Sequence, residues 1–232
     1  MEEARSRNLK APYNVQELAK QQVGTILLRY IHDDIETISD SSMLLPEIPV
    51  IDMLAIGDDN SELQRLHFAC KEWGYFQLVN HGVSSSLVEK VKSEIQAFFN
   101  LPMEEKKKFE QQEGDVEGYG QDVVFTEEQK DIMEEYCKEM KSLTMIIIRQ
   151  LGKALRMDEK EMRDLSNDGM LLIRMNYYPP CHEPDKTIGV SPHSDTDALT
   201  ILLQLNETDG LQVRKDHIWV PIKPLPNAFI VN

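Results

Sequence analysis

The chain has 232 residues, with 25 Lys and Arg against 40 Asp and Glu, which gives a formal net charge of −15. This surplus of negative charge repels a nucleic-acid backbone or an anionic membrane surface, so both are excluded as favoured partners. The length and the 41% of apolar residues predict one large globular domain or two small ones.

The first residues are charged where a signal peptide would turn apolar, and the apolar runs are short, as in 145–148. Cys70, Cys137 and Cys181 lie far apart and form no Cys-x-x-Cys unit, so we expect reduced thiols. These features predict a cytoplasmic protein.

In the N-terminal half, the folded part is expected to begin near Glu47. Residues 48–52 predict a short strand with Pro49 near its start. A helix is expected from Ser61, because apolar residues recur at helical spacing and Gly74 can end the helix in a left-handed turn. Residues 75–79 then predict a second strand.

Two longer helices follow. The first is expected from Ser84 and must stop near Asn100, because Pro102 cannot continue it but can begin a new helical turn. The second begins after Thr126 and is the longest, since apolar residues form a stripe over 132–151.

After Gly169 the sequence changes to short β-like runs separated by Pro, Gly and Asp. These runs are 170–178, 198–205, 211–214, 217–222 and 228–231. Strands at such spacing are typical of a sandwich or barrel. Helices first and strands second favour an α+β or jelly-roll arrangement over a doubly wound sheet.

His193 and Asp195 are candidate metal ligands. Side chains two apart in an extended segment share a face, with Cα atoms about 6.5 Å apart. One imidazole and one carboxylate belong to the two-histidine, one-carboxylate set of non-haem Fe(II) sites. The spacing alone is not specific, because His32 and Asp34 repeat it in a polar stretch.

A polar face is predicted on 170–178, where Arg174, Asn176 and Tyr178 alternate with apolar residues. Inside a barrel this face would need a polar guest, and the Arg174 guanidinium suits a carboxylate. Outside a barrel it would be an ordinary solvated surface. The alternation itself leaves both interpretations open.

Several long motifs resemble plant 2-oxoglutarate/Fe(II)-dependent dioxygenases. The segments similar to that family's catalytic domain are 174–181, 193–204, 210–213 and 219–232, and those similar to its N-terminal domain are 48–52, 69–82 and 118–121. The resemblance is strongest to the branch holding opiate-alkaloid O-demethylases and norcoclaurine-synthase-like proteins. It covers nearly the whole chain from about Glu17.

The resemblance implies an α+β fold, with a helical N-terminal part and an incomplete double-stranded β-helix of the jelly-roll, cupin-like kind. It divides the chain into an N-terminal extension at 1–46, a non-haem dioxygenase N-terminal domain at 47–125, a long connecting helix region at 126–168 and a partial catalytic domain at 169–232.

The resemblance further implies that His193 and Asp195 bind the iron and that Asn176 and Tyr178 contact 2-oxoglutarate. We assign Arg174, on the same face, to the cofactor-binding group. The implied cofactors are Fe(II), 2-oxoglutarate as co-substrate and O2, with ascorbate as an auxiliary. The implied reaction is hydroxylation or O-demethylation of a small molecule, an alkaloid- or flavonoid-like plant metabolite.

The sequence departs from the family pattern in two places. It ends at Asn232, before the second iron histidine and the Arg-x-Ser pair of the family, and the stretch after Gln121 is shorter than usual. We therefore expect a C-terminally truncated chain with impaired activity and with 228–231 as an unpaired apolar edge. The alternatives are a non-catalytic binding or decoy protein, and a cupin-like isomerase or hydrolase that uses another metal.

The remaining histidines are not expected to replace the absent ligand. His81 and His217 are predicted at the surface or in turns, His67 on a helix and His182 before a proline loop. Asp197 would share a face with His193 and Asp195 if the strand continued unbroken, and would there suit a basic amine; the alternative is a solvated acid at a strand entry.

Overall fold

A computed structural model describes residues 15–20, 26, 28–31, 46–57, 60–109, 127–158, 160–162 and 171–232. The contacts divide the chain into two compact units. Unit 1 consists of 1–37, 95–126 and 172–194, and unit 2 of 38–94, 127–171 and 195–232. Within the described part, no helix has the length and apolarity needed to cross a membrane.

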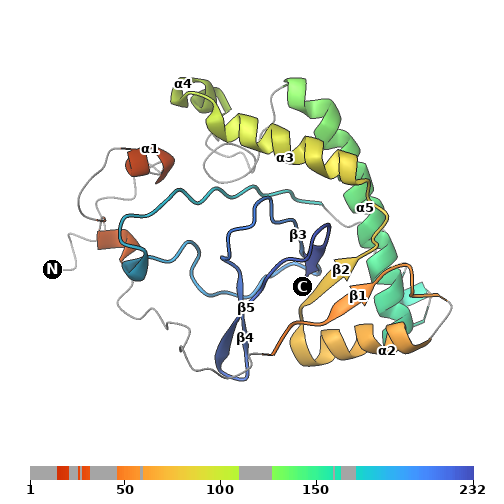
Figure 1. The fold of residues 1–232 in the computed structure, drawn as a ribbon. Coiled ribbons are helices and arrows are strands. Elements are labelled where there is room, and N and C mark those ends of the chain that lie inside the picture. Colours follow the sequence, from red (N-terminus) through yellow and green to blue (C-terminus); the bar gives the residue numbers. More distant parts are fainter. Residues whose placement is uncertain are drawn as a thin grey trace. The chain divides into compact units, whose positions relative to one another are not determined.

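Unit 2 is built on a four-stranded mixed sheet (Figure 1). Its order is β1 (Val50–Asp52), β2 (Phe76–Val79), β6 (Phe229–Val231) and β3 (Ile201–Leu202). β1 and β2 are parallel, whereas β6 runs antiparallel to both of its neighbours. A separate antiparallel hairpin joins β4 (Gln212–Lys215) to β5 (Ile218–Pro221).

The helices expected near Ser61 and Ser84, after Pro102 and after Thr126 are all present, whereas the short 3-10 helices at 28–30, 107–109 and 184–186 are not predicted from the sequence. Unit 2 holds α2 (Asn60–Phe68), the π-helix η2 (Ala69–Trp73) and α5 (Glu127–Leu155), which packs against α2 (Figure 1); α3 (Ser85–Asn100) begins in the same unit. Unit 1 holds α1 (Val15–Lys20), η1 (Leu28–Tyr30), α4 (Met103–Lys106), η3 (Lys107–Phe109) and η4 (Pro184–Lys186). Gly74 ends η2 at φ 69°, a left-handed conformation that favours glycine.

Of the predicted strands, one is absent and another is shorter than predicted. The described residues 171–178 form no strand, because no described segment pairs with them and alternation without a ladder does not make a sheet. The strand expected at 198–205 shortens to Ile201–Leu202. Thr126 and the short stretch after Gln121 lie outside the described residues.

The expected unpaired edge at 228–231 is also wrong. β6 lies inside the sheet, where Val231 faces Phe76 of β2 on one side and Ile201 of β3 on the other. All three residues of β6 are buried, with at most 1% of their surface exposed. β6 is paired with β2 on one side and with β3 on the other, so neither of its edges is open. The edge strands of this sheet are β1 and β3.

The core of unit 2 joins the sheet to the hairpin. One cluster of its buried residues is Ile48, Val213, Ile222 and Ile230, with Trp73, Tyr75, Leu202 and Leu211 packed around them. These residues come from distant parts of the sequence, and burial of their apolar area stabilises the unit.

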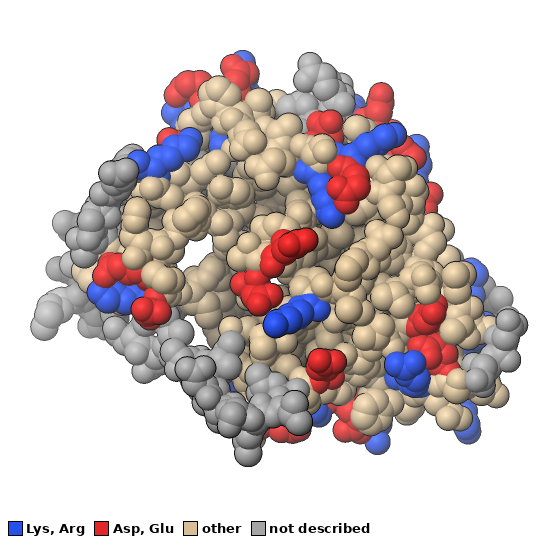
Figure 2. Space-filling view, viewed as in Figure 1, with Lys and Arg blue, Asp and Glu red and all other residues tan. Residues whose placement is uncertain are grey.

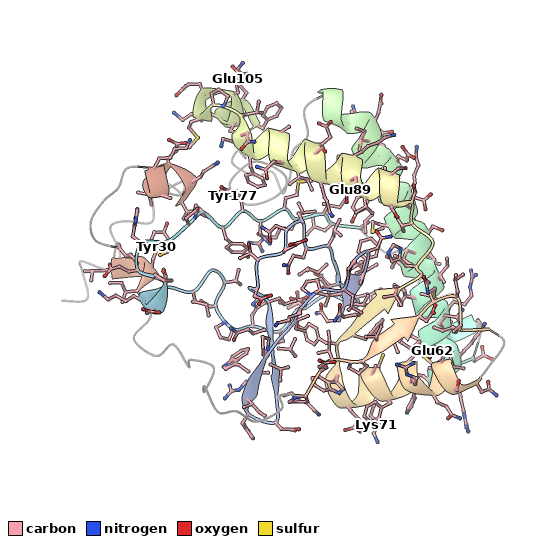
Figure 3. All side chains as sticks on the ribbon, in the orientation of Figure 1. Tyr30, Glu62, Lys71, Glu89, Glu105 and Tyr177 are labelled. Carbon is pink, nitrogen blue, oxygen red and sulfur yellow. The ribbon has the colours of Figure 1, made fainter. Side chains whose placement is uncertain are left out.

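A buried carboxylate ties α2 to β1. Glu62 is labelled on α2 in Figure 3, and its Oε1 accepts the backbone N–H of Asp52 at 2.8 Å. Its Oε2 accepts a hydrogen bond from Nη1 of Arg65 at 3.0 Å, and Nη2 of Arg65 donates to the carbonyl of Val50 at 2.8 Å. Because each carboxylate oxygen has a donor, the cost of burying this charge is offset.

In unit 1, a buried lysine joins α1 to the end of α3. Lys106 Nζ donates to Gln16 Oε1 at 2.5 Å and to the carbonyl of Phe99 at 2.9 Å. Burial lowers the pKa of this amine, the nearby charge of Lys20 lowers it further and that of Glu17 opposes the shift. The bond to Phe99 satisfies one of the last carbonyls of α3, which have no partner within the helix.

Charged side chains are interspersed over the face drawn in Figure 2, and its described residues show no stripe of one sign. Ion pairs one helical turn apart join Lys92 to Glu89 at 2.9 Å and Lys108 to Glu105 at 2.6 Å. Such exposed pairs contribute little to stability.

His81 is buried, contrary to the surface position expected for it, and it fixes the turn after β2. Its Nδ1 accepts the N–H of Val83 at 3.2 Å, so Nε2 carries the hydrogen and donates to the carbonyl of Asn227 at 3.0 Å. The ring packs on Phe229 at 4.4 Å between centroids. Burial lowers the pKa of His81, and the bond to Asn227 opposes that shift.

We predict that unit 2 loses stability as pH falls below about 6.5, the ordinary pKa of histidine. The folded-state pKa of His81 is lowered, so the unfolded chain binds the proton more tightly. The contribution of His81 is therefore complete above that value and decreases below it. Urea unfolding between about pH 5.5 and pH 7.5 measures this dependence.

The variant His81→Gln removes the titrating ring and should flatten this pH dependence. His182→Gln, which removes an exposed imidazole, should leave it unchanged. An equal pH slope in the wild type and in His81→Gln would contradict the assignment.

Candidate functional site

The segment before His193 lies in unit 1 and is held there by an aromatic stack. Tyr177, labelled in Figure 3, stacks on Phe99 at 5.2 Å between ring centroids with an interplanar angle of 25°. The predicted alternation persists only in part: Arg174, Asn176 and Tyr178 are exposed and Ile173 and Met175 are half-buried, but Tyr177 is exposed as well. The polar set is exposed without being part of a strand.

Tyr178 rests against the backbone of Gly189. A Cβ atom placed on Gly189 would lie 2.9 Å from both Cδ1 and Cε1 of the Tyr178 ring, so only glycine leaves room for the ring in this position. Burial raises the pKa of the Tyr178 phenol, while the charge of Arg174 lowers it.

His193 is oriented by a local hydrogen bond. Its Nδ1 lies 2.8 Å from the carbonyl oxygen of Ser191. A carbonyl can only accept, so Nδ1 carries the hydrogen and Nε2 keeps the lone pair. Metal-binding histidines commonly donate their second ring nitrogen to a carbonyl in this way, which fixes the ring and its tautomer.

Asp195 opens the last segment of unit 2, and two donors converge on one of its oxygens. Thr200 Oγ1 donates to Oδ2 at 2.6 Å, and Asn232 Nδ2 donates to the same oxygen at 2.9 Å. Burial raises the pKa of the Tyr75 phenol, and the charge of Asp195 raises it further, so Tyr75 lies near this carboxylate. Sequence reasoning missed Thr200, Asn232 and Tyr75.

His193 in unit 1 offers an imidazole and Asp195 in unit 2 offers a carboxylate, and both are ligand types that Fe(II) accepts; each has a hydrogen bond that orients it. Only Ser194 separates the two, so their Cα atoms are at most about 7 Å apart by covalent geometry. The described residues contain no group of three or more His, Cys, Asp or Glu that could hold a metal ion. A third protein ligand is therefore not among them.

Other candidate residues lie elsewhere. His67 Nδ1 lies 3.2 Å from the carbonyl of Ala154, near the end of α5, while His182 and His217 are exposed. Asp197 is exposed at a bend before β3. The unbroken strand that would align Asp197 with Asp195 does not form, and its interpretation as a solvated acid is the one that the geometry favours.

Two family models match this chain. Residues 48–145 match the non-haem dioxygenase in morphine synthesis N-terminal family, and residues 170–232 match the 2OG-Fe(II) oxygenase superfamily. The chain belongs to the 2OG-Fe(II) oxygenase superfamily. Members of this superfamily use Fe(II), 2-oxoglutarate and O2, so these three predicted cofactors and the predicted enzyme class are confirmed, whereas ascorbate stays a prediction.

Relatives with long alignments place this oxygenase beside plant proteins, as the sequence resemblance predicted. It is 45% identical to oxoglutarate-dependent flavonoid 7-O-demethylase 1 of Ocimum basilicum, over 97% of this chain and 69% of the relative. It is 44% identical to protein SRG1 of Arabidopsis thaliana and 42% identical to thebaine 6-O-demethylase of Papaver somniferum, each over 94% of this chain and 72% of the relative.

A solved structure supports the same fold. The crystal structure of JOX2 in complex with 2OG, Fe and JA matches this oxygenase with a TM-score of 0.74 and 30% identity. The match covers 94% of this chain and 72% of JOX2. The predicted α+β fold with a double-stranded β-helix is thereby confirmed.

We predict that Gly189→Ala weakens 2-oxoglutarate binding about fivefold, the equivalent of one hydrogen bond, because the added methyl group displaces the Tyr178 ring. Tyr178 is 56% exposed and can move, so the thermal midpoint should change little. Calorimetric titration of 2-oxoglutarate with Mn(II) present measures the affinity.

Gly210→Ala is the matched control, since its Cβ would meet nothing closer than 4.0 Å. If Gly189→Ala moved the Tyr178 ring, as seen by NMR, but left the affinity unchanged, Tyr178 would not contact 2-oxoglutarate.

Proposed function

We propose that this chain serves an oxygenase that hydroxylates or O-demethylates a plant specialised metabolite of alkaloid or flavonoid type, acting in the cytoplasm. The observation that carries the proposal is the identity of 42–45% to a thebaine and a flavonoid O-demethylase, along more than nine-tenths of the chain. At this level of similarity the same site chemistry is the simplest expectation.

In this proposal His193 and Asp195 bind Fe(II), and Arg174, Asn176 and Tyr178 bind 2-oxoglutarate. The tautomer of His193 and the two donors to Asp195 support the first assignment. The resemblance to the family and a guanidinium suited to a carboxylate support the second, whereas the exposure of all three side chains favours the alternative of a solvated surface. When bound, Fe(II) with 2-oxoglutarate and O2 supplies the oxidising power that a C–H bond requires.

Hydroxylation and O-demethylation share one chemical event. Inserting one oxygen atom into a C–H bond of an O-methyl group gives a hemiacetal, which breaks into a free hydroxyl and formaldehyde. The second oxygen atom of O2 enters succinate as 2-oxoglutarate loses CO2. Formaldehyde release therefore distinguishes demethylation from hydroxylation at a carbon that bears no ether.

We further propose that the 232 residues by themselves turn over slowly. The supporting observation is that the described residues contain no group of three metal-ligating side chains. Two protein ligands bind Fe(II) weakly and fix its geometry poorly. The same observation favours the second candidate, a non-catalytic protein that binds the small molecule without oxidising it.

We predict that the purified chain converts 2-oxoglutarate to succinate at least about 100-fold more slowly than a version continued beyond Asn232 with the strands of a relative. Both would be supplied with Fe(II), O2 and a panel of methoxylated flavonoids and alkaloids. Succinate, formaldehyde and product mass are the readouts. In the extended version, Asp195→Asn should abolish succinate formation, whereas Asp197→Asn, a neighbouring exposed acid, should not.

Equal turnover by both versions would contradict the proposed impairment. Substrate binding by the 232-residue chain without succinate would favour the binding-protein alternative. If the extended version consumed 2-oxoglutarate but released neither formaldehyde nor a hydroxylated product with any panel member, the substrate class would be wrong.

A further inference from the structure

Phe99, near the end of α3, joins three segments of unit 1. Its carbonyl accepts Nε2 of Gln16 in α1 at 2.8 Å and Nζ of Lys106 in α4 at 2.9 Å. Nζ of Lys106 also donates to Oε1 of Gln16 at 2.5 Å, so these two side chains and the carbonyl close a triangle of hydrogen bonds. Because Lys106 is fully buried, breaking the triangle is costly. The backbone of Phe99 is therefore fixed from outside its own helix.

The ring of Phe99 is held as well. It stacks on the ring of Tyr177, which Figure 3 labels, and it meets the ring of Phe98 edge-on, with 5.7 Å between centroids and an interplanar angle of 81°. Phe98 is buried and lies edge-on to Phe109 at 6.1 Å. Both arrangements are favourable for aromatic pairs beyond the area that they bury. Tyr177 is thus connected through Phe99 to α1 and α4.

Residues 174–178 depend on such contacts for their order. No sheet of the described structure includes them, and the three side chains assigned to 2-oxoglutarate are exposed. Tyr177 lies between Asn176 and Tyr178 in the chain, with each neighbouring Cα about 3.8 Å from its own. A displacement of Tyr177 therefore moves both neighbours. Binding through side chains that must first be ordered costs affinity.

We propose that Phe99 is a positioning residue for Asn176 and Tyr178, and that Gln16 and Lys106 act through it. This inference rests on the proposed function, in which Asn176 and Tyr178 bind 2-oxoglutarate. The three residues order the segment at 174–178 before the co-substrate binds. Their loss therefore lowers the affinity for 2-oxoglutarate without lowering the affinity for the metal. The N-terminal helix α1 thereby contributes to co-substrate binding, although it is distant from this segment in the sequence.

Calorimetric titration of the 232-residue chain with 2-oxoglutarate, with Mn(II) present, tests this inference. Phe99→Leu keeps the carbonyl and an apolar side chain but removes the stack, and should weaken 2-oxoglutarate binding about fivefold. Phe99→Tyr keeps an aromatic ring and should recover most of the affinity. Lys106→Met removes the buried donor and should weaken binding about threefold. Phe68→Leu, at an exposed phenylalanine of α2, is the matched control.

A measurement without co-substrate tests the link itself. NMR of the chain with labelled tyrosine rings reports Tyr177 and Tyr178 separately. Lys106→Met changes neither of the stacked rings, yet it should shift the signals of both tyrosines, whereas Phe68→Leu should not. The Mn(II) affinity of every variant should stay within twofold of the wild type, which separates positioning from a general loss of structure. Thermal unfolding shows that each variant is folded at the temperature of the titration.

The outcomes distinguish the two levels of the proposal. If the wild type binds no 2-oxoglutarate, or Asn176→Ala binds it within twofold of the wild type, the proposed co-substrate site is wrong and the inference fails with it. If Asn176→Ala weakens binding but Phe99→Leu and Lys106→Met stay within twofold of the wild type, the site stands and the positioning role is overturned. Unshifted tyrosine signals in Lys106→Met, or an equal loss of affinity in Phe68→Leu, would also overturn it.

Discussion

The two-sided pairing of β6 is the constraint on which the rest of unit 2 depends. Antiparallel partners flank this strand, and its three residues are buried, so its register is determined on both edges at once. A slip of one residue would turn each buried side chain to the opposite face. The same register places Asn232 opposite Thr200. The side chains of both residues donate a hydrogen bond to Oδ2 of Asp195.

The approach to β6 is held by polar side chains from the β2 region. Gln77 of β2 donates to the carbonyl of Lys223 at 3.2 Å and accepts the N–H of Leu225 at 2.8 Å. His81 donates to the carbonyl of Asn227 in the same approach. These two side chains supply hydrogen-bond partners to backbone groups of the connection at 223–227, where no ladder can. The register of β6 is thus supported before the strand begins.

Sequence reasoning found the features whose causes are local. Gly74 marks the end of a helix because the left-handed turn is a property of that residue, and the stripe of α5 needs only its own periodicity. The alternation at 171–178 predicted a strand that does not form, since a strand also needs a partner and an alternating pattern does not supply one. The burial of His81 depends on Phe229, and the support of Asp195 on Asn232, and no local pattern in the chain records either contact.

The two candidate ligands also differ in whether the groups that orient them are local in the sequence. The imidazole of His193 is fixed by a carbonyl only two residues earlier, so its tautomer follows from the local chain alone. The carboxylate of Asp195 is fixed by residues from two strands, so its orientation exists only when the sheet is complete. The nitrogen ligand is therefore prepared by local structure, whereas the oxygen ligand is prepared by folding. In the proposed site, metal affinity would therefore depend on the integrity of the β3–β6 ladder.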